Sequence, residues 1–267
     1  MCKGVAVGVP EVTGVDFGGP GSAPLVVLGP SLGTSAATLW GSVAQLLVRN
    51  FRVIGWNLPG HGGAPSAAQQ FSVADLACGV LSCVDRLATT TVFHYAGTSI
   101  GGCVGLQLAL DAQPRVRTAT LLATGASVGA PADWRERADM VRRAGTAAMY
   151  AASAERWFAP GFTSREPEVS SRLLQALLDT DDDAYARVCE AFATFDFTAC
   201  LSRISTPVLC IAGAHDRATP PETLQRLALG VQRGRLEVLP AAGHLAAAED
   251  PARVADLITR TADAYPG

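Results

Sequence analysis

The chain has 267 residues, of which 49% are apolar and 17% charged, and its formal net charge is −3. The length suits one core domain with a sizeable insertion, since domains usually run to roughly 100–200 residues. The weak charge argues against nucleic-acid binding, which normally requires a basic stripe. No run approaches the roughly 18 uninterrupted apolar residues of a membrane helix, and the first residues do not resemble a secretory signal.

Seven cysteines are scattered along the chain, mostly inside apolar segments and without a C-x-x-C pair. This pattern favours small buried side chains in a reducing compartment over disulfides or a metal site. We therefore expect a cytoplasmic protein without a metal or other cofactor.

Short apolar runs bounded by Gly and Pro alternate with helical patterns, which is typical of a mostly parallel sheet with helices on both faces. The predicted strands, in chain order, are 24–29, 51–56, 91–97, 116–124, 207–213 and 235–240, and segments near 5–9 and 11–17 are expected to add an antiparallel edge hairpin. Predicted helices include 73–87, where Ser72 and Asp75 approach a capping box, 100–112, and 251–264, whose first turn suits Pro251.

The alternation of strands and helices breaks between about residues 126 and 200, where the sequence becomes helical and charged. It resumes just before Pro207. A helical insertion between two core strands is the simplest account. We therefore expect a core formed by residues 1–125 and 201–267 and a helical cap formed by residues 126–200.

The segment Gly97-Thr98-Ser99-Ile100-Gly101-Gly102 lies between a predicted strand and a predicted helix. A sharp turn there would expose Ser99, and glycines two residues before and after it avoid collisions across the turn. The next amide, of Ile100, begins a helix and can stabilise an oxyanion. A structural serine beside packing glycines is the alternative, but the surrounding strand and helix favour a nucleophile.

A serine nucleophile needs a base, and the chain has four histidines. His244 lies in a loop between the last predicted strand and the last helix, at the sheet edge where the turn at Ser99 also lies. Asp216 follows the strand 207–213, and the order Ser, Asp, His is the one that α/β-hydrolases use. Taken singly, Asp216 could be a turn residue and His244 a loop residue. The other histidines are expected in structural or solvent-facing positions: His61, His94 and His215.

A second oxyanion donor is expected from the loop that follows the strand 24–29. The amide of Leu32 is the best candidate, and the Ser31 hydroxyl is expected to contact substrate. His61-Gly62-Gly63 is superficially similar to a lipase oxyanion motif, but it follows a different strand and is rejected.

Together these residues resemble the 3-oxoadipate enol-lactone hydrolases of the α/β-hydrolase superfamily. The elbow and Pro59-Gly60-His61-Gly62 are generic to the superfamily, whereas Ser31-Leu32-Gly33-Thr34 is narrower. The chain departs from the family pattern at Asn57 and beside Ser99, without touching the predicted triad. Further matching stretches extend the similarity over nearly the whole chain: 133–137, 156–162, 213–216 and 243–245.

The resemblance implies a cofactor-free serine hydrolase that opens a small enol-lactone through an acyl-enzyme. Because that lactone carries a carboxylate, an arginine fork is expected to orient it. Arg135 is favoured, with Trp134 as an apolar wall, although Arg135 and Asp139 are also spaced as on a solvated helix face. The alternative arginines stay open: Arg137, Arg142 and Arg143.

Two other functions stay open at this point. The same triad serves esterases, perhydrolases and biosynthetic lactone hydrolases, and some proteins of this fold are receptors without turnover. The expected partner is a small lactone or ester, with no nucleic acid and no membrane. The sequence does not define an oligomeric state.

Overall fold

The computed structural model describes residues 8–88 and 92–266. This part of the chain forms a seven-stranded sheet in the order β1-β3-β2-β4-β5-β6-β7. All neighbouring strands are parallel except β1 and β3. The strands are β1 Thr13–Gly18, β2 Leu25–Gly29, β3 Arg52–Asn57, β4 Phe93–Thr98, β5 Val116–Leu122, β6 Val208–Gly213 and β7 Gly234–Leu239.

The predicted mostly parallel sheet is confirmed, and the six predicted core strands lie within two residues of the observed ones. The expected edge hairpin is only partly found. Residues 11–17 correspond to β1, which pairs antiparallel with β3 at the sheet edge. Residues 5–7 lie outside the described residues, and Gly8 and Val9 do not belong to a strand.

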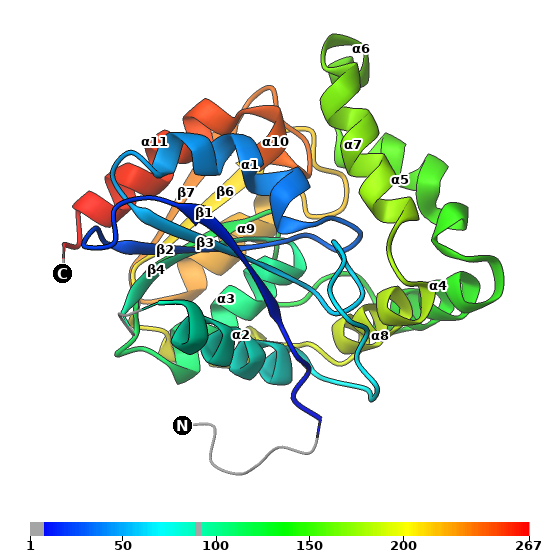
Figure 1. The fold of residues 1–267 in the computed structure, drawn as a ribbon, viewed down its shortest axis with the longest axis horizontal. Helices are drawn as coiled ribbons and strands as arrows, with labels where there is room; N and C mark the ends of the chain where they lie inside the picture. The colour runs from blue at the N-terminus through cyan, green and yellow to red at the C-terminus, as the bar shows by residue number, and fades with distance from the viewer. Residues whose placement is uncertain (1–7, 89–91, 267) are drawn as a thin grey trace.

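Helices cover both faces of the sheet, as predicted. Figure 1 shows α1, α10 and α11 on one side and α2, α3 and α9 on the other. Ser72 and Asp75 form the expected capping box at the start of α2, and Pro251 begins α11. These helices are α1 Ala36–Leu47, α2 Val73–Leu87, α3 Ile100–Asp111, α9 Pro221–Gly230, α10 Ala246–Glu249 and α11 Pro251–Asp263.

Between β5 and β6 the chain forms a group of helices that stands beside the sheet in Figure 1. We call α4 to α8 the inserted helices. Two 3₁₀ turns, η1 Thr146–Met149 and η2 Thr198–Arg203, lie in the same part of the chain. The inserted helices are α4 Pro131–Ala144, α5 Tyr150–Trp157, α6 Phe162–Arg165, α7 Pro167–Leu178 and α8 Asp182–Ala193.

The cysteines follow the expectation only in part. Four of them are buried and free: Cys83, Cys103, Cys189 and Cys210. Cys200 is free and half-buried. Cys78 is disulfide-bonded, so the expectation that no cysteine forms a disulfide is wrong at this position. Cys2 lies outside the described residues, and the cytoplasmic location stays a prediction.

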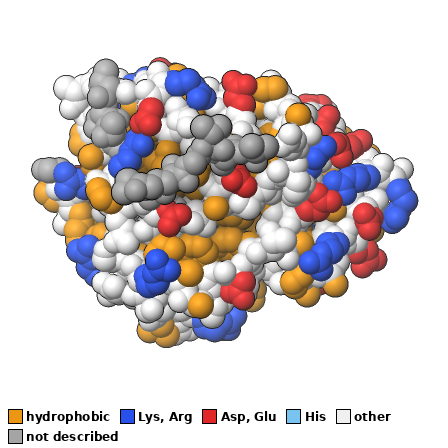
Figure 2. Space-filling model, turned by 90° about the horizontal axis from the view of Figure 1, so that it is seen from below, with side chains coloured by type: hydrophobic (Ala, Val, Ile, Leu, Met, Phe, Trp, Pro, Cys, Tyr) orange, Lys and Arg blue, Asp and Glu red, His pale blue; other side chains and the backbone are white. Residues whose placement is uncertain are grey.

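The surface combines charges of both signs. Figure 2 shows acidic and basic side chains interspersed on one face, many of them toward the end of the molecule formed by the inserted helices. Within residues 8–88 and 92–266, no helix combines the length and apolar character needed to cross a bilayer.

Candidate active site

Ser99 occupies a sharp turn between β4 and α3. Its backbone has φ 56° and ψ −113°, a region that a residue with a side chain rarely adopts. Hydrogen bonds hold it there: its N–H donates to Leu122 O at 2.9 Å, and its carbonyl accepts from Thr124 Oγ1 at 3.0 Å. The turn therefore presents Ser99 at the end of β4 in a fixed and strained conformation.

The neighbouring glycines are required by close backbone approach. A Cβ on Gly97 would lie 2.3 Å from Gly101 O, and one on Gly101 would lie 2.6 Å from Pro30 O. A Cβ on Gly102 would lie 2.6 Å from the Thr124 side chain. Gly101 also donates its N–H to Pro30 O at 3.0 Å. The glycines thus let the turn lie directly against the loop that follows β2.

His244 and Asp216 meet at the carboxyl ends of β6 and β7. His244 Nδ1 lies 2.9 Å from Asp216 Oδ2, and both side chains are buried. The carboxylate also accepts from Thr219 Oγ1 at 2.6 Å, from Thr219 N at 3.0 Å and from Ala218 N at 2.8 Å. An ionised carboxylate only accepts, so Nδ1 of His244 carries the proton and Nε2 of the neutral ring is an acceptor.

The Asp216 carboxyl stays ionised in this position. Burial raises its pKa, but the charge and hydrogen bond of His244 and the hydrogen bonds from Thr219 outweigh burial. The pKa of Asp216 therefore lies below its ordinary value, which keeps the acceptor for His244 Nδ1 charged at neutral pH.

A cavity of about 230 Å³ joins these elements. It is lined by Ser31, Leu32, Ser99, Trp134 and His244, so five of the residues singled out in the sequence face one space. The loops after β2 and β4 and the loop that holds His244 form one wall, and the inserted helices form the other. The volume lies below the roughly 300–1,000 Å³ typical of drug-sized ligands and suits a small molecule.

The N–H groups of two buried residues predicted for the site have no acceptor among the described residues. Leu32 and Ile100 are buried, and among the described residues neither backbone N–H makes a hydrogen bond. Buried N–H groups are rarely left unpaired. Leu32 lines the Ser99 cavity, and Ile100 directly follows Ser99 at the start of α3.

Arg135 is an exception among the predicted site residues. It is exposed and lines a different surface hollow, beside Asp75 and Glu190. Three other arginines line the Ser99 cavity: Arg137, Arg156 and Arg217. Arg135 lies about 100° around α4 from Trp134, whereas a residue three positions after Trp134 shares its face.

Among the arginines that line the cavity, Arg137 is an open alternative from the sequence, while Arg156 and Arg217 are not among the predicted candidates. The guanidinium of Arg137 stacks 4.6 Å from the Trp134 ring centroid, and Trp134 stacks on Phe192 of α8 at 4.3 Å. Burial and the nearby charge of Arg137 lower the pKa of Arg156 below its ordinary value. Neither arginine makes a salt bridge to a carboxylate within the part of the chain that the structure describes.

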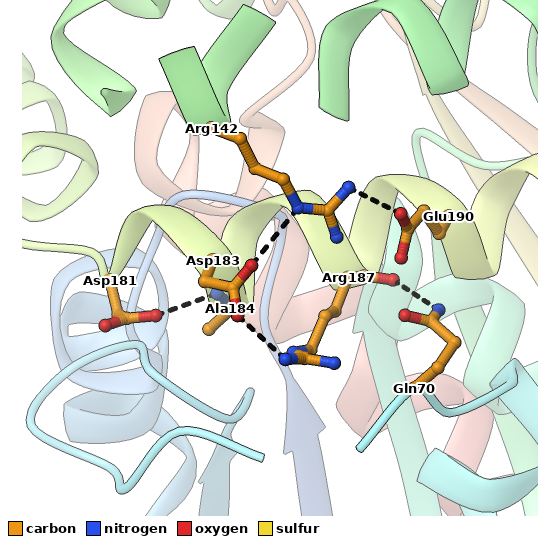
Figure 3. Close-up of polar contacts among 7 residues, drawn as sticks. All are labelled: Gln70, Arg142, Asp181, Asp183, Ala184, Arg187 and Glu190. Atoms are coloured by element: carbon orange, nitrogen blue, oxygen red, sulfur yellow. Dashed lines mark hydrogen bonds and ion pairs between the residues drawn. The ribbon is translucent and has the colours of Figure 1, made fainter. Parts of the chain in front are cut away.

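The other two alternative arginines lie elsewhere. Arg143 is exposed. Arg142 bridges Asp183 at 3.1 Å and Glu190 at 2.6 Å on α8, as Figure 3 shows. Arg187 extends this network by donating to Asp183 at 2.8 Å. The network fixes α4 against α8, and so holds the helices that carry Arg137 and Tyr185 at the cavity.

His61, His94 and His215 do not line the Ser99 cavity. The buried His61 ring donates from Nδ1 to Pro59 O at 2.8 Å, His94 pairs with Thr118 Oγ1 at 2.9 Å, and His215 is exposed. Among the described residues, no group of three or more His, Cys, Asp or Glu side chains could hold a metal ion.

Comparisons with known proteins identify the family of this fold. A family model described as alpha/beta hydrolase fold matches residues 24–251. The 3-oxoadipate enol-lactonase 2 of Acinetobacter baylyi is 32% identical over 87% of this chain and 86% of its own length. A Variovorax paradoxus protein named as a carbamate hydrolase, RutD, is 30% identical over 85% of this chain and 86% of its own length.

A solved structure also matches closely. The enol-lactonase from Burkholderia xenovorans LB400 is similar with a TM-score of 0.89 and 29% identity, covering 94% of this chain and 95% of that one. The chain therefore belongs to the alpha/beta hydrolase fold family, in which enol-lactonases are among its relatives.

Proposed function

We propose that this protein is a serine hydrolase of small carboxylic esters or lactones, with Ser99 as nucleophile, His244 as general base and Asp216 as its partner. One observation carries the proposal: Ser99 and His244 line the same small cavity while Asp216 holds the far nitrogen of the His244 ring. That arrangement leaves Nε2 of His244 free to accept the serine proton.

The reaction follows from these roles. The Ser99 oxygen attacks the carbonyl carbon as its proton passes to His244 Nε2, and the charged ring is stabilised by Asp216. The bond to the leaving oxygen then breaks, and His244 returns the proton to that oxygen. Water attacks the acyl-enzyme, its proton passes through His244 to Ser99, and the acid is released.

The oxyanion of each tetrahedral intermediate would accept from the amides of Leu32 and Ile100. Neither N–H has an acceptor among the described residues, which supports this role. Loss of one such donor typically costs about 10²–10³ in kcat. The Ser31 hydroxyl is the nearby polar group expected to contact substrate, and it lies at the same cavity wall.

The substrate class follows from the inserted helices. Arg137 and Arg156 of the inserted helices line the cavity beside Trp134 as an apolar wall, and Arg217 lines it from the loop after β6. None of the three arginines makes a salt bridge among the described residues. A guanidinium matches a carboxylate in geometry and charge. Together with the enol-lactonase relatives, this favours a lactone that carries a carboxylate, and 3-oxoadipate enol-lactone is the specific candidate. On this account residues 126–200 act as a cap over the core.

A second candidate is a carbamate hydrolase, favoured by the similarity to RutD. The same triad could attack a carbamate carbonyl. A neutral carbamate that carries no carboxylate would not need the cationic side chains that line the cavity. Relative kcat/KM on the enol-lactone, simple carbamates and p-nitrophenyl esters separates the two functions.

The experiment that tests the triad is Ser99→Ala with this panel. Loss of a triad member lowers kcat by about 10⁴–10⁶, and the variant should keep the circular dichroism of the parent protein. Unchanged turnover by Ser99→Ala would refute the proposed chemistry. Stoichiometric fluorophosphonate labelling without multiple turnovers of any ester or lactone would instead indicate a receptor.

The substrate class has its own test. Arg137→Met is expected to raise KM for the carboxylate-bearing lactone about 10- to 100-fold, since a charged hydrogen bond contributes about 1.5–3 kcal/mol. Arg135→Met on the same helix is the matched control and should leave KM unchanged. Equal effects of the two variants would rule out a specific carboxylate site.

A further inference from the structure

Glu249, the last residue of α10, has a carboxylate that none of the proposed steps uses. Its Oε1 accepts the N–H of Gly243 at 2.8 Å, and its Oε2 accepts the N–H of Ala159 at 2.7 Å. Gly243 immediately precedes His244, and Ala159 follows α5 of the inserted helices. One carboxylate therefore joins the loop of the proposed base to the opposite side of the site.

The two segments also touch directly. A Cβ on Gly243 would lie 2.8 Å from Ala159 N, so no larger residue fits at this position. Leu245 donates its N–H to Trp157 O at 3.1 Å. Trp157 lines the cavity together with Ser99. The position of the His244 loop is thus tied to the position of the cavity wall.

The other flank of the loop is fixed by backbone contacts to the Asp216 segment. His215 N–H donates to Ala242 O at 3.0 Å. A Cβ on Gly213 would lie 2.1 Å from Gly243 O. The His244 loop is therefore held between the Asp216 segment on one side and Glu249 on the other.

We infer that Glu249 is a positioning residue for His244, acting through the Gly243 peptide to set the imidazole relative to Ser99 and to the Trp157 wall. This inference rests on the proposed serine hydrolase function. Glu249 interacts electrostatically with His244, so its negative charge also favours the imidazolium that forms when Ser99 loses its proton.

The two N–H donors favour the charged form of the Glu249 carboxylate, whereas burial opposes it. Burial raises the pKa of Glu249 above its ordinary value, even though the Ala159 and Gly243 amides donate to it. Because the ionised form is disfavoured by burial, neutralising this side chain should affect stability less than activity. If Glu249 served only to join the two segments, its neutralisation would lower stability more than activity.

Glu249→Gln is the informative variant. The glutamine oxygen can accept from only one of the two N–H groups, of Gly243 or Ala159, and its NH₂ group then faces the other N–H. We expect kcat on p-nitrophenyl acetate and on a carboxylate-bearing lactone to fall about 10- to 100-fold, with KM changed less than about threefold. The acid limb of the kcat/KM profile should move to lower pH, since the negative charge is lost. Glu249→Asp keeps the charge, so it should keep the limb while losing part of kcat.

Asp250→Ala is the matched control. Asp250 caps α11 by accepting from Arg253 N at 3.1 Å, and its loss should lower Tm at least as much as Glu249→Gln does. Its kcat should stay within about twofold of the parent and its acid limb should not move. An equal loss of kcat in Asp250→Ala at equal Tm loss would overturn the positioning role.

The two proposals fail in different ways. Full activity of Ser99→Ala would refute the serine mechanism whatever Glu249 does. If Ser99→Ala is inactive while Glu249→Gln and Glu249→Asp keep the parental kcat and acid limb, the positioning role alone is wrong. If Glu249→Gln does not fold, the kcat and acid limb of Glu249→Asp decide the question.

Discussion

Mild acid should destabilise this protein through a buried histidine that does not line the Ser99 cavity. His61 has no exposed surface, its Nδ1 donates to Pro59 O at 2.8 Å, and its Nε2 has no partner among the described residues. Burial lowers the pKa of His61 from 6.5 to about 4. A second proton would therefore enter a site that offers it no acceptor.

The sign and size of the effect follow from linkage. Because the folded-state pKa of His61 is depressed, its contribution to stability is fully present above pH 6.5 and is lost as the pH falls toward 4. A difference of about 2.5 pKa units corresponds to about 3 kcal/mol when both states are protonated. At pH 5 the loss should already reach about 2 kcal/mol.

The assay is urea unfolding at pH 7 and pH 5, for the parent protein, His61→Asn and His215→Asn. An asparagine amide can still donate to Pro59 O but does not titrate, so His61→Asn should lose about 2 kcal/mol less between the two pH values. The exposed His215 is the control, and His215→Asn should follow the parent. The reasoning is refuted if His61→Asn and the parent lose the same free energy of unfolding on acidification.

Two further substitutions test the site itself. Asp216→Asn should lower kcat about 10³- to 10⁴-fold with little change in Tm, since the amide no longer favours the Nδ1–H tautomer of His244. A kcat that falls by less than tenfold in steady-state measurements would contradict this. Gly102→Ala should cost about 1–3 kcal/mol, because its Cβ would lie 2.6 Å from Thr124. Gly41→Ala in α1, where a Cβ meets nothing within 4 Å, should instead stabilise by about 0.5–1 kcal/mol, and equal Tm shifts in the two variants would be the contrary result.

The fold and the proposed triad could be predicted because their signals are local. The apolar runs that become β2 to β7 are short and bounded by Gly or Pro, and Ser99 lies between a clear strand and a clear helix. In a parallel sheet the carboxyl ends of the strands share one edge. Assigning Ser99, Asp216 and His244 to loops after three such strands was therefore enough to predict that they converge.

The arginines of the inserted helices that line the cavity could not be predicted in the same way. Which side of α4 faces the cavity depends on how that helix packs on α8, through contacts such as Trp134 with Phe192. Helical spacing from Trp134 would have favoured Arg137 over Arg135. No local pattern, however, links Arg156 on α5 to Arg137, because their proximity depends on the packing of separate helices.

The two walls of the cavity come from different parts of the fold. We therefore predict that a substitution can change substrate selectivity without changing the reactivity of Ser99. The Ser99 turn and the Asp216–His244 pair lie in loops at the carboxyl ends of sheet strands, whereas Arg137 lies on α4 and lines the same cavity. A small neutral fluorophosphonate needs the activated serine but no carboxylate site. The fluorophosphonate should therefore label Arg137→Met at the parental rate, within about twofold, while the KM of this variant for a carboxylate-bearing lactone rises. A parallel loss of labelling would mean that Arg137 supports the geometry of Ser99 and not the selection of substrate.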